Sequence, residues 1–334
     1  MSEPAPGPAD PTPDPSGTVR PPAPDQGFLP PDEAYRQAAP AFTAADDPLV
    51  NPAEQRISGW AHRIGMVLRR SWRPLATIFL LTHALPAIAF GALTLGGSIG
   101  LDALDLRRLV TYGDQRRVIG VLIATVLAYL VVVLPAQMLG YAAATHHATR
   151  QAAGLTVSIG QSLRFGLRRF LGLAAYQVVA YVLVGVAVLA VAMCCVGGAE
   201  YLGLVPTGLV YAYLAMATAL VGPAYLFGRG NPVGSSFRLL HAAFWPTAAR
   251  LFLLGLAILA SAFVETMISG IGEWLSGSLG VVPAAPLAFT AAALAALVEV
   301  PLTMLLFSGI LITYAERLAA ERGVDTNDLV AWLC

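Results

Sequence analysis

Five polar side chains lie inside long apolar stretches, and these are the residues with the clearest potential for chemistry. Two are carboxylates, one is an imidazole and two are amides: Glu265, Glu299, His83, Gln137 and Gln177. Ionisable groups within a membrane are costly and often mark paths for ions or protons. If the five faced one another, they could line a polar cavity in which Glu265 and Glu299 share a proton. The alternative is structural, because proline residues in the same stretches free backbone carbonyls that a Gln or a protonated Glu can satisfy.

Three cysteines and one histidine pair are the other residues whose chemistry needs interpretation. Cys194 and Cys195 are adjacent in an apolar stretch and Cys334 is the last residue, which indicates no disulfide framework. His146 and His147 lack the thiol or carboxylate partners of a metal site, and we expect this pair to be wetted by solvent. No phosphate-binding, dinucleotide-binding, metalloprotease or serine hydrolase motif occurs. The sequence therefore predicts no metal, no cofactor and no enzyme activity.

The elements that must position these residues are membrane helices. Charged residues make up 12% of the chain and hydrophobic residues 57%, whereas a soluble domain carries about 25% charged residues. A helix needs about 20 apolar residues to cross the hydrocarbon core. Six stretches meet this requirement: residues 74–101, 118–149, 170–199, 201–228, 251–272 and 287–315. The predicted fold is all-α, a six-span polytopic bundle.

The first 56 residues differ in composition from the rest of the chain. They hold 14 of the 24 prolines, and nine acidic residues against three arginines. Such a segment cannot bury enough apolar surface to offset its conformational entropy. We therefore predict a disordered acidic tail over residues 1–56, with no identifiable partner, and a six-helix domain over residues 57–334 that ends in a short cytoplasmic tail.

Arginine residues gather beside alternate spans and predict the orientation of the bundle. Residues 56–73 contain five arginines, residues 150–169 four and residues 229–250 three, and Arg317 and Arg322 follow the last span. Residues 98–117 oppose the pattern, with four arginines on the other side. The larger set places both termini in the cytoplasm, and the expected location is a bacterial plasma membrane.

A short basic motif recurs before the first, third and fifth spans. It reads IGMVLR at 64–69, IGQSLR at 159–164 and VGSSFR at 233–238. The pattern predicts three units, each an amphipathic interfacial helix followed by a two-helix hairpin; the alternative is that these are ordinary basic linkers. Residues placed to contact anionic lipid are arginines together with tryptophans, which favour the membrane boundary: Arg69, Arg164, Arg168, Arg169, Arg238, Trp72 and Trp245.

Two segments resemble a known family. GRGNPVGSSFRLLHAAFWP at 228–246 and PLTMLLFSGILITYAERLAAERGVDTNDL at 301–329 are similar to the membrane domain of glycerophosphoryl diester phosphodiesterase. The resemblance covers about residues 60–332. Members that carry the enzyme have a soluble metal-dependent barrel, for which this chain has no room outside its spans. The resemblance therefore implies a fold and a membrane location, and no catalytic residue is carried over.

These features favour a non-enzymatic accessory or scaffold protein that contacts membrane lipids. The alternative is a transporter of a small solute or of protons that uses Glu265 and Glu299. Nucleic-acid binding is not expected, because the basic and aromatic segments lie against the membrane. An oligomer is possible.

Overall fold

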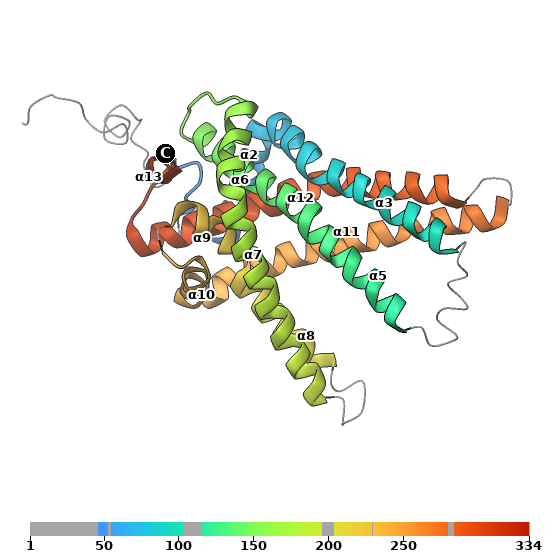
Figure 1. Ribbon diagram of the computed structural model, residues 1–334. Helices are drawn as coiled ribbons and strands as arrows, with labels where there is room; N and C mark the ends of the chain where they lie inside the picture. Colours follow the sequence, from blue (N-terminus) through green and yellow to red (C-terminus); the bar gives the residue numbers. More distant parts are fainter. Residues whose placement is uncertain are drawn as a thin grey trace, which may run out of the picture. The chain divides into compact units, whose positions relative to one another are not determined.

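The computed structural model describes residues 46–52, 55–102, 115–195, 204–228, 230–279 and 284–333, and every regular element within these ranges is helical (Figure 1). Six helical segments are long and apolar enough to cross a membrane. Their bounds are Arg56–Leu93, Ile123–Ala152, Ile159–Cys194, Val205–Phe227, Phe244–Ile268 and Phe289–Arg322. Each overlaps one of the stretches expected from the sequence. The prediction of an all-α, six-span fold is confirmed.

The first two spans are each interrupted by one π-helical turn. The first consists of α2 (Arg56–Phe79), η2 (Leu80–Ala84) and α3 (Leu85–Asp102). The second consists of α5 (Gln115–Ala128), η3 (Tyr129–Val133) and α6 (Leu134–Ala152). A proline, Pro86 or Pro135, is the second residue after each π turn. Because proline has no amide hydrogen and its ring crowds the carbonyl four residues earlier, the hydrogen-bond ladder shifts locally.

The remaining spans are formed by α7 (Ile159–Cys195), by α8 (Leu204–Thr218) with α9 (Val221–Phe227), by α11 (Phe244–Leu279) and by α12 (Ala284–Arg322). Two shorter helices complete the chain, α10 (Pro232–Ala242) and α13 (Thr326–Leu333). Helices α6 and α7 pack against each other, as do α11 and α12 (Figure 1).

The three basic motifs occupy different local structures. Residues 64–69 lie within α2 and residues 159–164 form the beginning of α7, so neither forms a helix separate from its span. Only the third motif forms a helix of its own, α10, which Ala243 separates from α11. Asn231 caps α10 and Pro232 occupies its first turn, while Pro246 occupies the first turn of α11. Proline is tolerated at both places because first-turn amides have no partner within the helix.

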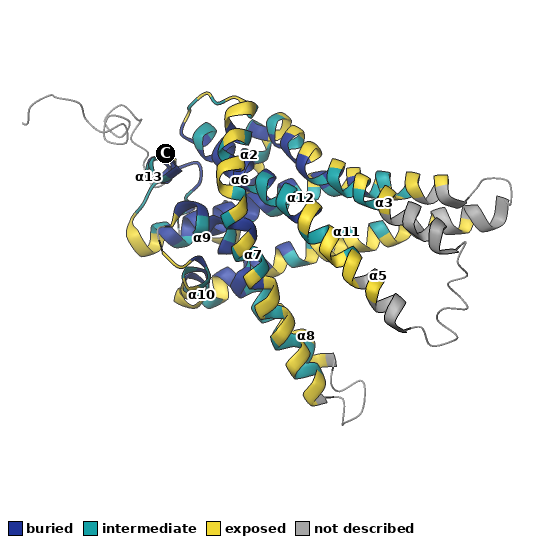
Figure 2. Ribbon diagram, viewed as in Figure 1, coloured by how far each residue is buried: buried dark blue, intermediate teal, exposed yellow. Residues whose placement is uncertain are grey.

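Burial is concentrated where α2, α6, α9 and α12 meet, and exposed residues follow α5, α8 and α11 (Figure 2). The buried core includes Leu75, Phe79, Leu173, Leu240 and Leu311. Large apolar side chains are exposed along the spans, among them Val131, Leu189 and Phe263. Lipid tails supply the apolar environment that such surfaces need. The burial pattern is that of a bundle solvated by a bilayer.

The predicted tail over residues 1–56 needs a correction at its C-terminal end. Residues 1–45 lie outside the described residues. Residues 46–52, however, pack against the helices, with Leu49 and Asp47 buried. Helix α13 is also packed, with Leu329 and Val330 buried. The composition of residues 46–52 is that of a tail. Two of these residues, Asp47 and Asn51, nevertheless form hydrogen bonds with Thr326 and Glu316, which are more than 200 residues away in the chain.

Candidate functional site

A buried carboxylate, Glu316 on α12, forms the centre of a charged cluster. Glu316 forms an ion pair with Nη2 of Arg250 on α11 at 2.8 Å, and a second ion pair with Arg317. The side chains of Glu316 and Arg250 are 4% and 3% exposed. Asn51 Nδ2 donates a hydrogen bond to Glu316 Oε2 at 3.3 Å. A buried ion pair needs such additional partners to offset the loss of hydration.

The cluster continues from Asn51 to Arg63 on α2 and to Asp47. Arg63 Nη1 donates to Asn51 Oδ1 at 2.9 Å and to Gln55 Oε1 at 2.8 Å, and Arg63 Nε donates to the Asp47 carbonyl at 3.1 Å. The Asp47 carboxylate accepts hydrogen bonds from the backbone N and the hydroxyl of Thr326, at 2.9 and 2.6 Å. We call these residues the Glu316 cluster: Asp47, Asn51, Arg63, Arg250, Glu316, Arg317 and Thr326. The cluster joins residues 46–52 to α2, α11, α12 and α13.

The sequence pattern did not predict this cluster, because it indicated only that Arg63 and Arg250 are charges that determine the orientation of the bundle in the membrane. A signal was present for Arg63. Trp60, Arg63, Ile64 and Val67 share one face of α2 at helical spacing, and all four are buried. An arginine within such an apolar face indicates a buried partner. No comparable signal identifies Asp47 or Asn51.

The lipid-contact candidates are nearly all on the surface. Trp72 is 53% exposed and Trp245 80%, and the Arg73 guanidinium lies 5.3 Å from the centre of the Trp72 ring. Arg238 differs from the other candidate arginines because it forms an ion pair with Glu321 at 3.2 Å. The other four candidate arginines, Arg69, Arg164, Arg168 and Arg169, are exposed and have no ion pair with another residue of the described ranges.

The histidine pair expected to be wetted is buried, and this prediction is wrong. His146 and His147 are 6% and 4% exposed. The Nδ1 atoms of both rings lie 3.3 Å from the Ser162 hydroxyl, and His146 stacks on Phe165. The cause is close packing of α6 on α7, where a Cβ at Gly166 would meet the Leu139 carbonyl oxygen at 2.6 Å. Small residues let two helix backbones approach closely, and side chains at the contact, here the two histidines, become buried.

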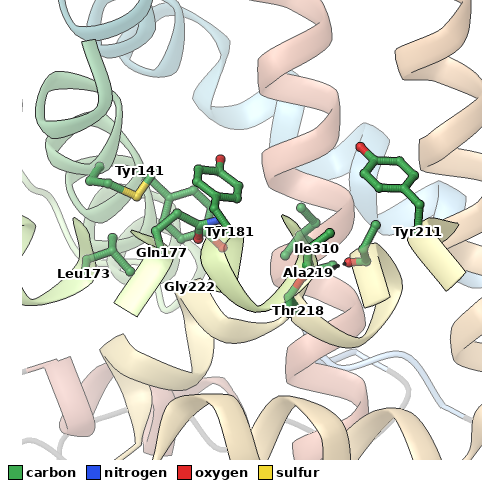
Figure 3. A pocket seen from close by; sticks show the side chains of 12 residues that line it. Tyr141, Leu173, Gln177, Tyr181, Tyr211, Thr218, Ala219, Gly222 and Ile310 are labelled. Atoms are coloured by element: carbon green, nitrogen blue, oxygen red, sulfur yellow. Dashed lines mark hydrogen bonds between the residues drawn. The ribbon is translucent and has the colours of Figure 1, made fainter. Parts of the chain in front are cut away.

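One of the five intramembrane polar residues, Gln177, lines a cavity of about 270 Å³. The polar lining residues also include Tyr141, Tyr181, Tyr211 and Thr218. Figure 3 shows Gln177 and Tyr181 close together, with Tyr211 set apart from them. The Tyr141 hydroxyl is buried and finds no hydrogen-bond partner in the described part of the chain. The cavity can hold polar groups or water within the bundle.

The other four intramembrane residues do not line this cavity. Gln137 accepts a hydrogen bond from the Tyr129 hydroxyl at 3.3 Å. His83 lies in η2, its ring 6.0 Å from that of Phe79. Glu265 on α11 and Glu299 on α12 are partly buried and close enough to interact electrostatically. The structure therefore brings the two carboxylates near each other but does not bring all five residues to one site.

Within the described ranges, no group of three or more His, Cys, Asp or Glu residues is arranged to hold a metal ion. Comparisons of the chain with protein families, with curated proteins and with solved structures found no match. The arrangement of side chains is therefore the basis for assigning a function.

Replacing Glu316 tests whether the buried cluster holds the helices together. The Glu316→Gln change leaves Arg250 and Arg317 buried without their carboxylate. Breaking a buried pair in this way costs about 3–5 kcal/mol, so we expect a large drop in the thermal unfolding midpoint of the detergent-purified protein. Glu321→Gln, on the same helix, removes an exposed pair and should cost at most about 1 kcal/mol. Equal midpoints for the two variants would contradict a structural role for the cluster.

Proposed function

We propose that this integral membrane protein is a non-enzymatic accessory or scaffold protein that binds anionic lipid. In this proposal it lies in a bacterial plasma membrane, with both termini and its basic end in the cytoplasm. The basic end is the end of the bundle that carries Arg69, Arg164, Arg168, Arg169 and Arg238. The observation that carries the proposal is that four of these five arginines are exposed without a carboxylate partner in the described chain.

The contacts between helices support a common position for these arginines. Arg164, Arg168 and Arg169 lie in the first turns of α7, and Arg69 lies on α2. Helix α6 contacts both α7 and α2. An arginine near an anionic membrane surface contributes about 1 kcal/mol of binding free energy. Several such residues together favour anionic over zwitterionic lipid.

The exposed tryptophans support a position of this end of the bundle at the headgroup boundary of the membrane. Trp72 lies beside Arg73 on α2, and Trp245 is in the first turn of α11. An indole ring favours the headgroup boundary because its body is apolar and its N–H is polar. The Glu316 cluster packs the interior of this end, so the exposed arginines are left to interact with lipid headgroups.

The sequence resemblance fits this proposal, and we propose that residues 60–332 are related to the membrane domain of glycerophosphoryl diester phosphodiesterase. The two segments that carry the resemblance are adjacent in space. Residues 228–246 include α10, and residues 301–329 include the end of α12; the Arg238–Glu321 ion pair joins them. Membership in this family would imply a shared membrane fold.

A transporter is the second candidate function, and the cavity beside Gln177 favours it. The proposed carboxylates, Glu265 and Glu299, lie outside that cavity. If these residues carry protons, proteoliposomes containing the protein will acidify under a membrane potential, and E265Q/E299Q will abolish the flux. The scaffold proposal instead predicts that wild-type and E265Q/E299Q proteoliposomes both match protein-free vesicles. A pH-sensitive dye trapped inside the vesicles measures the difference.

Replacing the α7 arginines tests the lipid proposal. We expect the triple change R164Q/R168Q/R169Q to lower the preference for phosphatidylglycerol over phosphatidylcholine by up to about a hundredfold, because three lost charges remove at most about 3 kcal/mol of attraction. Electron paramagnetic resonance of spin-labelled lipids measures this preference in reconstituted vesicles. The matched variant R164K/R168K/R169K keeps the charge and should keep the preference. A wild-type preference in the Gln variant would refute the lipid role of these residues.

A further inference from the structure

A second cavity, of about 390 Å³, lies between α9, α10, α12 and α13 and has the features of an anion site. Small-molecule sites commonly measure about 300–1,000 Å³. The α9–α10–α12–α13 cavity, which we call the Arg322 cavity, is lined by Arg238, Arg322, Tyr314, Ser235 and Trp332, with apolar walls from Phe227 and Leu318 among others. Among the described residues, its lining contains two cationic side chains and no acidic one. The balance of charge therefore favours an anionic guest.

The hydroxyl of Tyr314 is the second feature that indicates a ligand. Tyr314 is only 3% exposed, and its ring stacks on Phe227 with centroids 5.7 Å apart. The hydroxyl makes no hydrogen bond to any residue of the described ranges, although the side chain lines the cavity. Two cations, Arg322 and Arg238, and one anion, Glu321, lie within electrostatic range of it. The hydroxyl is therefore available to donate a hydrogen bond to a guest in the cavity.

The two arginines differ in what they can offer. Arg238 already forms an ion pair with Glu321 at 3.2 Å. Arg322 has no ion pair with any other described residue and is exposed. Arg322 is thus the main free cation of the cavity, while Glu321 competes with a guest for Arg238. Guanidinium groups bind phosphate oxygens in a planar, often bidentate geometry.

The N-terminus of α10 also faces this region, but it is not the basis of the site. Asn231 Oδ1 accepts from the amides of Val233 and Gly234 at 3.1 and 3.3 Å, and Pro232 has no amide hydrogen. The amide of Ser235 bonds to the Asn231 carbonyl. The helix can therefore add only the partial positive charge of its dipole. The donors available to a guest are side chains.

We propose that the Arg322 cavity binds one phosphate group, held by Arg322 and Arg238 and by the Tyr314 hydroxyl. The phosphate belongs either to a lipid headgroup or to a free phosphate ion, since both present the same oxygens. The inference deepens the proposed function and rests on it, because it assigns one defined headgroup site at the basic end.

Calorimetric titration of the full-length protein in a non-ionic detergent tests the proposal with two probes. One is short-chain phosphatidylglycerol and the other is inorganic phosphate. We expect at least one of them to bind. Binding of the lipid alone identifies a headgroup site, and binding of free phosphate identifies a site that accepts the ion itself; either supports the proposal. Binding of neither overturns it.

Three single changes make the test specific to the cavity. We expect Arg322→Gln to weaken binding about tenfold, the usual effect of losing one charge-assisted hydrogen bond, and Tyr314→Phe to weaken it several-fold. Glu321→Gln should tighten binding, because it frees Arg238; a merely structural role for this pair would not produce a gain. Wild-type affinity in both Arg322→Gln and Tyr314→Phe would refute the assignment.

The α7 variant R164Q/R168Q/R169Q separates this inference from the proposed function. It should lower the general lipid preference and leave the calorimetric site unchanged. If that variant loses lipid preference while Arg322→Gln binds both probes normally, the proposed function stands and the cavity assignment fails. If the cavity variants lose binding while the α7 variant keeps its lipid preference, the α7 contribution fails and the cavity site stands.

Discussion

The interaction on which the basic end of the bundle depends is the contact of Glu316 with its arginines. A carboxylate removed from water is tolerated only when cations and hydrogen-bond donors replace its hydration. Arg250 and Arg317 supply the charges, and Asn51 supplies a neutral donor. Because these groups come from α11, α12 and residues 46–52, satisfying one buried charge fixes the relative position of three segments. Arg63 and Asp47 continue the hydrogen-bond network, and they connect residues 46–52 to α2 and α13.

The placement of this cluster accounts for the contrast between the two regions of the bundle. Along the spans, lipid solvates the exposed apolar side chains, so little burial by protein is needed. Near the Glu316 cluster, the helices bury their apolar faces against each other. Most of the described arginines outside the cluster are exposed. In the proposed function, these exposed arginines contact anionic lipid.

The sequence was sufficient to predict the six spans, because length and apolar composition determine whether a helix can cross a bilayer. It was not sufficient for the site. The contact between Asp47 and Thr326 joins residues far apart in the chain, and nothing in local composition indicates it. Arg63 could have been recognised from its place on the apolar face of α2. The burial of His146 and His147 could not, because it depends on how closely Gly166 lets α6 approach α7.

We propose that the arginine-bearing end of the bundle lies on the cytoplasmic side. Labelling of single cysteines with a membrane-impermeant maleimide tests it in a background without the native cysteines. Thr156→Cys and Gly230→Cys place a thiol at exposed positions of the basic end, and Trp274→Cys places one at an exposed position of α11 beyond the fifth span. We predict that intact cells label only Trp274→Cys, and that the other two react after the membrane is permeabilised. Labelling of Thr156→Cys or Gly230→Cys in intact cells would contradict the account.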